Sequence, residues 1–306
     1  MEKVLENEIG SVLKRLREES GLTRSELYSG VMSPAHAHRV ENQNQVPGFF
    51  KITEILKRMS LDVDEFLFIA NGYEMEETGQ FIQRFKDIRI TLNVEMMQQL
   101  KKEIDQTLVE GNKPFLECLS QVLDSYIYIQ ETDDWVGARK KFYQVWQILE
   151  KKEIWNYQDI LLMSNIFYIF DEPAINQIFK RLNFYFELYG DFKDLKKLKR
   201  VTKYNYCSFL RERGRQLENE QRLNEVAAEA KQAMDIPMYL ECRYYLSELL
   251  WMKNMKDVGR REAKRVLLLL DNLEMDIFSN DNRKDWKKLT GEDLEPFHVA
   301  EEGLTW

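Results

Sequence analysis

The sequence predicts an all-α protein, with a small N-terminal domain of five short helices followed by a long array of antiparallel helices. Glycine and proline are scarce, with 13 and 6 residues among 306, about half of average usage, so turns must be few. Apolar residues recur with helical spacing along most of the chain. The breaks between these segments are short, and short connections force neighbouring helices to run antiparallel.

The first domain, residues 1–71, carries local signals for each of its helices. The second helix begins with the capping-box spacing of Thr23 and Glu26. The third begins with a serine cap followed by a first-position proline, Ser33-Pro34, and extends through Val40. The apolar positions that define the other helices are Ile9, Leu13 and Leu16 in the first, Ile52, Ile55, Leu56 and Met59 in the fourth, and Val63, Phe66, Leu67 and Ile69 in the fifth.

Residues 72–80 are acidic at their centre and are interpreted as a linker or the start of the next helix, residues 81–290 as a helical-repeat domain, and residues 291–306 as a tail. A short helix around Arg283–Leu289 is expected near the end of the repeats. The other helices expected between these limits are Phe81–Val109, Phe115–Gln130, Trp135–Lys151, Trp155–Phe170, Pro173–Tyr189, Phe192–Arg213, Glu220–Met234, Met238–Met252 and Val258–Leu273.

A weak internal repeat runs through this domain. The second helix of each pair begins near residues 134, 172, 219 and 257, and a small residue follows in three of them: Ala138, Ala227 and Ala263. Periods of about 34 to 47 residues are typical of tetratricopeptide-like arrays, in which small residues let paired helices approach closely. The repeat consensus is not matched, so an irregular helical bundle is the alternative.

The segment RLREESGLTRSEL…SPAHAHRVE resembles the phage-repressor, or XRE, type of helix-turn-helix domain over about 60 residues. The resemblance implies that the third helix enters the major groove of DNA. It also implies an ion pair between the first helix and the end of the third, at the positions of Arg17 and Glu41, with a structural role.

Candidate DNA contacts follow from this placement, because the N-terminal residues of a recognition helix face the base edges. His36 and Arg39 share one helix face; an arginine there can bind guanine or phosphate, and a local ion pair is the alternative for Arg39. Residues at the start of the second helix are placed to meet phosphate. The full set of candidates is Arg15, Thr23, Arg24, Ser33, Ala35, His36, His38 and Arg39.

The whole chain resembles the Rgg/GadR/MutR family of transcriptional regulators, through the N-terminal segment and the aromatic helices ILLMSNIFYIF and VTKYNYCSFL. The resemblance implies a cytoplasmic homodimer that binds double-stranded DNA and a short hydrophobic signalling peptide. Some members carry a cysteine after the third helix that can bridge the dimer. This chain has Asn42-Gln43-Asn44-Gln45 there, so redox control by that route is not expected.

A peptide would lie on the concave face of the array, where the first helix of each pair supplies polar groups for its backbone. Arg139 is a candidate for a peptide carboxylate, with an ordinary surface charge as its alternative. The aromatic residues of these helices are expected mainly in the core. The candidates for peptide binding are Arg139, Asn165, Tyr168, Tyr204, Asn205 and Arg243.

Composition excludes several other classes. The net charge is −8, and residues 1–71 hold 9 basic against 11 acidic residues, so one domain alone should bind DNA weakly and dimerisation would be needed. Nine basic residues between Lys193 and Arg215 are read as a solvated helix face, with DNA or an acidic partner as the alternative. The three cysteines, Cys118, Cys207 and Cys242, indicate buried thiols in a reducing compartment.

The longest aliphatic run, Val266–Leu270, is too short to span a membrane. Nucleotide-binding glycine motifs, metal-binding histidine patterns and nucleophile motifs are absent from the sequence, so neither an enzyme nor a cofactor is expected. The sequence therefore predicts a peptide-controlled transcriptional regulator of the quorum-sensing type. The alternative is a peptide-independent transcription factor, or a scaffold whose repeat domain binds another protein.

Overall fold

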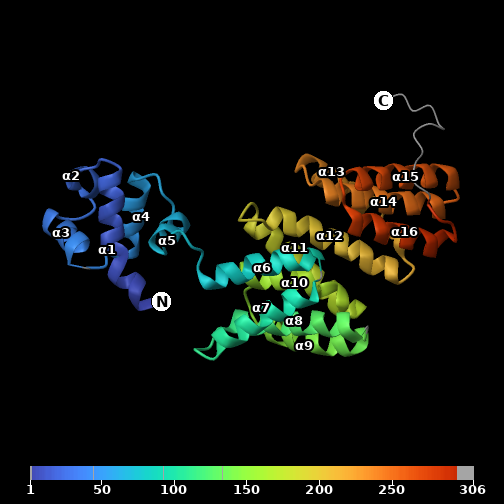
Figure 1. The fold of residues 1–306 in the computed structure, drawn as a ribbon, viewed down its shortest axis with the longest axis horizontal. Helices are drawn as coiled ribbons and strands as arrows, with labels where there is room; N and C mark the ends of the chain where they lie inside the picture. Colours follow the sequence, from blue (N-terminus) through green and yellow to red (C-terminus); the bar gives the residue numbers. More distant parts are fainter. Residues whose placement is uncertain (1, 44, 92, 133, 295–306) are drawn as a thin grey trace, which may run out of the picture. The chain divides into compact units, whose positions relative to one another are not determined.

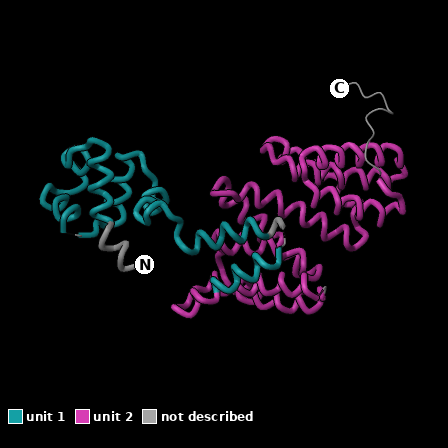
Figure 2. The backbone as a smooth tube through the Cα atoms, in the orientation of Figure 1, with its two compact units in different colours: residues 1–104 teal, residues 105–306 magenta. Residues whose placement is uncertain are grey.

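The computed structural model describes residues 2–43, 45–91, 93–132 and 134–294, with the backbone alone for residues 2–8 and 89–91. Regular structure within these ranges is helical throughout, without strands. The chain divides into two compact units, residues 1–104 and 105–306 (Figure 2). The expected all-α architecture is therefore confirmed, and part of the expected tail, residues 295–306, lies outside the described residues.

The first unit begins with five short helices, as the sequence predicts. They are α1 (Glu2–Glu19), α2 (Arg24–Tyr28), α3 (Pro34–Asn42), α4 (Phe49–Arg58) and α5 (Val63–Ala70) (Figure 1). The capping box of Thr23 and Glu26 is present at α2, and the Ser33 hydroxyl accepts a hydrogen bond from the His36 N–H at α3. These caps satisfy amides that a helix leaves unpaired at its start, so the sequence fixes both helix starts locally.

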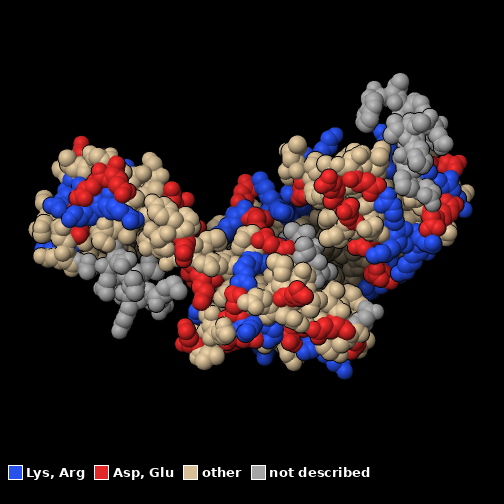
Figure 3. Space-filling model, in the orientation of Figure 1, with Lys and Arg blue, Asp and Glu red and all other residues tan. Residues whose placement is uncertain are grey.

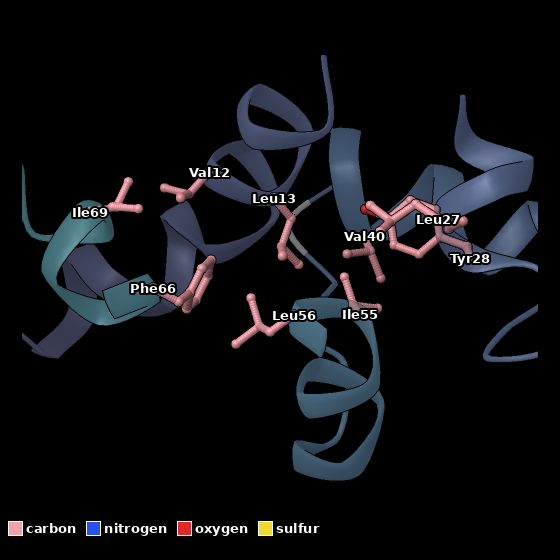
Figure 4. Packing of buried hydrophobic residues seen from close by; sticks show 10 residues of the cluster. Val12, Leu13, Leu27, Tyr28, Val40, Ile55, Leu56, Phe66 and Ile69 are labelled. Atoms are coloured by element: carbon pink, nitrogen blue, oxygen red, sulfur yellow. The ribbon is translucent and has the colours of Figure 1, made fainter. Parts of the chain in front are cut away.

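One apolar core joins these five helices. Leu13 of α1, Val40 of α3 and Ile55 of α4 are fully buried and lie together at its centre (Figure 4). Gly10 explains how closely α1 approaches α3, because a Cβ atom at this position would lie 1.9 Å from the Val40 carbonyl oxygen. Glycine is therefore needed at position 10 to seat α3 against the core.

Helices α6 (Glu77–Thr91) and α7 (Val94–Leu108) replace the single helix expected over Phe81–Val109. The Asn93 side chain accepts a hydrogen bond from the Met96 N–H and so caps α7, a role that asparagine favours. The sequence interpretation missed this cap and was wrong in joining the two helices. Arg84 and Glu103 form an ion pair that ties α6 to α7 within the first unit.

The second unit contains helices that pack in consecutive pairs. They are α8 (Pro114–Thr132), α9 (Trp135–Glu150), α10 (Tyr157–Ile166), α11 (Glu172–Tyr189), α12 (Leu195–Glu212), α13 (Glu220–Gln232), α14 (Ile236–Met252), α15 (Lys256–Asn272) and α16 (Asp276–Thr290). The first helices also contact one another, α8 with α10, α10 with α12, and α14 with α16. This arrangement is the predicted array of helix pairs.

Small residues lie where the pairs are tight, as expected. Ala138 and Ala263 are fully buried, and Ala227 nearly so. On α15 a glycine continues the pattern, since a Cβ atom on Gly259 would lie 2.7 Å from the Ser247 carbonyl oxygen of α14. A larger residue at either position on α15 would force the two helices apart.

The C-terminal helices repeat with a constant step of 20 residues. Met234, Asn254 and Glu274 each follow a helix and each have a positive φ, of 55°, 64° and 55°. The residue after each donates its N–H to a carbonyl five positions earlier, at 2.9 to 3.0 Å. This is the left-handed closure that usually carries glycine. None of the three is glycine, so each turn retains some backbone strain.

Several helix ends differ from the sequence interpretation by two or three residues: α12 begins at Leu195 rather than Phe192, α14 at Ile236 rather than Met238, and α15 at Lys256 rather than Val258. α10 begins at Tyr157 rather than Trp155, because Asn156 and Asp159 form a capping box, and a 3-10 turn, Phe167–Ile169, follows it. α16 is longer than the helix expected over Arg283–Leu289, and Trp286 is its fully buried anchor.

The three cysteines are buried and free, and burial raises the pKa of Cys118 to about 11 and that of Cys207 to about 12. Such thiols stay protonated and are poor nucleophiles. Within the described residues, each helix is too short or too polar to cross a lipid bilayer.

Candidate DNA-binding and peptide-binding surfaces

The third helix turns one face to the core and one to solvent. Ala37 and Val40 are buried, whereas Ala35, His38 and Arg39 are exposed. After the Ser33 cap, the first two residues of α3, Pro34 and Ala35, are exposed. The face predicted to read DNA is thus accessible within the first unit, apart from His36.

His36 is half-buried, and its Nε2 atom is enclosed with no hydrogen-bond partner among the described residues. Burial lowers the pKa of His36, and the nearby cations Lys51 and Arg39 lower it further, so the ring is neutral at pH 7. Only Nδ1 remains for a contact with DNA. Lys51, on the first turn of α4, was missed in the sequence because its own helix gave no reason to place it beside α3.

Glu41 is fully buried and joins three elements. It accepts from Arg17 of α1 at 2.6 Å, the ion pair expected from the sequence, and also from Arg24 of α2 at 2.7 Å. Burial raises the pKa of Glu41, but the two guanidinium hydrogen bonds outweigh it and the pKa is lowered overall. Arg17 also pairs with the exposed Glu18 at 3.0 Å, so Glu41 is the buried anchor of a cluster in which Arg24 is the half-exposed cation.

The other basic side chains near α3 are also held by neighbours. Lys14 donates to Asn42 Oδ1 at 3.1 Å, and the Arg39 Nε donates to Gln45 Oε1 at 2.8 Å. The local ion pair considered for Arg39 is not what the described residues show, because its partner is a neutral amide. Arg15 and Thr23 are exposed on α1 and at the start of α2.

The six peptide-binding candidates divide into different environments. Asn165 is buried, and its amide donates to the Leu161 carbonyl at 2.6 Å, so it lies inside the array. Tyr168 is half-buried and its hydroxyl lies 3.4 Å from the hydroxyl of Tyr126. The Tyr126 hydroxyl of α8 also donates to the Asn165 carbonyl of α10 at 2.6 Å, so only the exposed part of Tyr168 is left for a ligand.

Asn205 and Tyr204 lie on α12. Asn205 is half-exposed, and no hydrogen bond of its side chain is recorded within the described part of the chain. The Tyr204 hydroxyl donates to Glu241 of α14 at 3.1 Å. Of the two asparagine candidates, Asn205 is therefore the one whose side-chain amide is available to pair with a peptide backbone.

The two arginine candidates make internal contacts. Arg139 donates from Nε to the Ile169 carbonyl at 2.8 Å, at the end of the 3-10 turn, and Arg243 pairs with Glu262 of α15 at 2.6 Å. Arg243 therefore faces the second helix of its pair. Arg139 retains its charge, because a carbonyl does not neutralise it.

A polar cluster links three first helices. Arg211 of α12 bonds to Glu248 of α14 and to Asp285 of α16, and the Glu241 carboxylate accepts from Asn282 of α16 at 2.9 Å. Burial raises the pKa of Glu248 to about 7, against the opposing effect of Arg211. This cluster was not foreseen, since its members are up to 74 residues apart.

The basic stretch before and along α12 is largely neutralised. Lys196, Lys199, Arg200 and Lys203 each pair with a carboxylate within the second unit. On the face shown in Figure 3, acidic and basic side chains are interspersed across this unit. The structure thus favours the solvated-face interpretation over a DNA-binding surface. Among the described residues, no group of three or more His, Cys, Asp or Glu side chains could hold a metal ion.

The fold and its surfaces define a helix-turn-helix protein with a helical-repeat second unit. Neither a protein-family model nor a curated protein matches the chain. A Listeria monocytogenes EGD-e protein, provisionally named a transcriptional regulator, is similar at 20% identity and TM-score 0.72 over 93% of this chain and 98% of that one.

Two further structures share the fold over most of their length. The Streptococcus dysgalactiae SHP pheromone receptor Rgg2 is 14% identical, with TM-score 0.64, over 92% of this chain and 99% of that one. Bacillus thuringiensis PlcR, in complex with the peptide PapR7 and DNA, is 17% identical, with TM-score 0.63, over 90% of this chain and 99% of that one. The resemblance inferred from the sequence is thus confirmed at the level of the fold.

Proposed function

We propose that this chain is a DNA-binding transcriptional regulator controlled by a short hydrophobic peptide, acting as a homodimer in the cytoplasm and not as an enzyme. The observation that carries the proposal is the likeness, over at least nine tenths of both chains, to a protein whose structure holds a peptide and DNA together. The solvent-facing side of α3 supports the DNA half of the proposal.

For DNA, the proposed contacts are Ser33, Ala35, His38 and Arg39 of the recognition helix, with His36 contributing through Nδ1 only. Arg15, Thr23, Arg24 and Lys51 would meet the phosphates on either side. The first 71 residues have a net charge of −2, so a single domain gains little from phosphate contacts. A homodimer doubles these contacts and matches a two-fold symmetric operator.

For the peptide, the proposed surface is the face of α10, α12 and α14, with Asn205 as the main backbone-pairing residue and Tyr168, Tyr204 and Arg139 beside it. Asn165 and Arg243 are left out, because the first is buried and the second pairs with α15. A peptide that binds one arrangement of the helix pairs more tightly would shift the population of the dimer toward it.

The DNA half is tested with duplexes enriched from a randomised pool by the wild-type protein. The variant His36→Ala/Arg39→Ala should bind them about 10 to 100 times more weakly, as expected for losing one base-reading side chain and its neighbour. Lys57→Ala, which removes a surface cation paired with Glu54, is the matched control and should bind normally. Equal affinities of the double variant and the control at low salt would reject the assignment of α3.

The peptide half is tested by thermal unfolding with a library of synthetic hydrophobic peptides of about seven residues. Some member should raise the melting temperature of the wild type, and Asn205→Ala should lose most of that shift because the amide can no longer pair with the peptide. If no peptide acts while DNA still binds, the second unit serves a protein partner or works without a ligand.

A further inference from the structure

We propose that Gln45 is a positioning residue that sets the Arg39 guanidinium for reading a guanine, and so determines base specificity. The inference rests on the proposed DNA-binding function. It concerns a residue beyond the end of α3, in a loop that would ordinarily be taken as a plain connection to α4.

Gln45 and Arg39 are tied together twice. The Arg39 Nε donates to Gln45 Oε1 at 2.8 Å, and the Gln45 backbone N–H donates to the Arg39 carbonyl at 3.3 Å. The same carbonyl accepts from the Gln43 N–H at 2.9 Å, which fixes the chain at the end of the helix. The side chain of Gln45 accepts from the Arg39 side chain, and the backbone of Gln45 is in turn held by the Arg39 carbonyl.

The hydrogen bond to Gln45 uses only the Nε–H of Arg39 and leaves the terminal N–H groups of the guanidinium available. Nε is one of five N–H donors, and no partner is recorded for the two terminal nitrogens of Arg39 among the described residues. A bidentate contact to O6 and N7 of guanine needs two such donors side by side. Holding Nε fixes the plane of the fork and removes rotamer freedom that the arginine would otherwise lose on binding.

The acceptor that holds Arg39 is a neutral amide, and this affects the charge that Arg39 can offer to DNA. Arg24, on the same surface, is held at Nε by the carboxylate of Glu41, which also pairs with Arg17. Gln45 instead positions Arg39 without cancelling its charge, so the side chain keeps its full attraction for DNA. Lys14 is held in the same neutral way by Asn42. The segment from Glu41 to Gln45 thus supports two basic side chains of α1, one of α2 and one of α3.

The test replaces each guanine of an enriched duplex in turn by 7-deazaguanine, which lacks the N7 acceptor but still pairs with cytosine. Wild-type protein should lose about 5- to 10-fold in affinity at one guanine per half-site, the size expected for half of a bidentate contact. Arg39→Ala and Gln45→Ala should both bind more weakly and show no further loss at that guanine.

Two variants separate positioning from general damage. Gln43→Ala removes a neighbouring exposed amide with no side-chain bond recorded to Arg39, and should keep the sensitivity to 7-deazaguanine. Gln45→Glu keeps the acceptor for Nε, so it should keep the sensitivity while lowering affinity for every duplex, because it adds negative charge. Gln45→Ala should bind poly(dA-dT), which carries no guanine, within about twofold of wild type, since the charge is unchanged.

The outcomes are distinct. Sensitivity to 7-deazaguanine that is lost in Arg39→Ala but kept in Gln45→Ala would overturn the positioning role alone. Sensitivity kept in both variants would show that a residue other than Arg39 contacts that N7, and would also overturn the inference. If the wild-type protein enriches no duplex at all, the proposed DNA-binding function fails and the role of Gln45 fails with it.

Discussion

Two charged clusters, one in each unit, share their buried charges in opposite ways. In the first unit, the buried Glu41 is shared by two cations, Arg17 and Arg24, and Arg17 also pairs with the exposed Glu18. In the second unit, Arg211 is shared by Glu248 and Asp285, two carboxylates for one cation. Both clusters join three helices, but the first buries a carboxylate between two cations, whereas the second buries a carboxylate beside a single cation that it shares.

The difference shows how the same ion-pair chemistry serves two purposes. A half-exposed cation such as Arg24 keeps its charge cheaply and can meet an anion from solvent. A buried carboxylate that shares its only cation cannot keep its charge cheaply, and it binds a proton more readily. Burial raises the pKa of both Glu248 and its neighbour Glu241. The first cluster therefore presents a charge to solvent, whereas the second responds to pH.

The largest effect is expected from Glu41→Ala. It leaves Arg17, which is 7% exposed, with only the exposed Glu18 as a counter-charge, and breaking a buried pair in this way costs about 3 to 5 kcal/mol. In the full chain, the α1 and α3 amides should lose hydrogen-exchange protection by a matching amount, while the protection of the α14 amides stays unchanged. A loss below about 1 kcal/mol would mean that the pair contributes little to the fold.

Glu248→Gln removes the buried carboxylate of the second cluster, and its effect on stability should depend on pH. The pKa of Glu248 is raised from 4.5 to about 7, so the folded chain binds this proton more tightly than the unfolded chain. Stability from this group is then fully present below about pH 4.5 and is lost as the pH rises through 7, by at most ~1.4 kcal/mol per pH unit. The charged groups that face it are Arg211, Glu241 and Asp285, and the neutral hydroxyl of Tyr244 also faces it.

Urea unfolding of the full chain at pH 5 to 8 measures this effect. In Glu248→Gln the free energy of unfolding should fall less between pH 5 and pH 8 than in the wild type. At pH 8 the second unit of the variant should be more stable than that of the wild type by about 1 to 3 kcal/mol. Glu262→Gln, at the partly exposed pair with Arg243, is the control and should keep the wild-type slope. An unchanged slope in Glu248→Gln would contradict proton binding at this cluster.

Arg24→Ala sharpens the comparison, because it removes the half-exposed cation and leaves the buried Glu41 with Arg17 as its one cation. Arg24 is 42% exposed, so the expected loss of stability is below about 1 kcal/mol. DNA affinity should fall for all duplexes alike, and the slope of log affinity against log salt should decrease by about 1 per domain. Loss of sequence preference instead would place Arg24 against a base.

The smallest effect concerns the repeated turns of the second unit. Asn254 has a φ of 64°, a conformation in which glycine pays no steric cost. Asn254→Gly should therefore stabilise the chain by up to about 1 kcal/mol, and Met234→Gly by slightly more, because asparagine tolerates this conformation better than methionine. Thermal unfolding should therefore show a larger increase in melting temperature for Met234→Gly than for Asn254→Gly. Destabilisation by both would show that these side chains contribute packing.

Local signals fixed much of the fold in advance. The caps at Thr23 and Ser33 and the breaks between long helices depend on neighbouring residues only, so they can be read from the chain. The join between α6 and α7 was misread because Asn93 interrupts an otherwise continuous apolar pattern. A single polar cap is easily lost in such a pattern.

The amino-acid sequence alone determined the helical class, the helix-turn-helix order and the pairing of the long helices, because periodicity and capping are local properties. Tertiary structure decided what individual polar residues do. Asn165 and Asn205 look equivalent in sequence, yet one is buried and bonded within its helix and the other is available at the surface. Likewise, only the folded chain brings Arg211 to Asp285, 74 residues away, because such contacts depend on how whole helices pack.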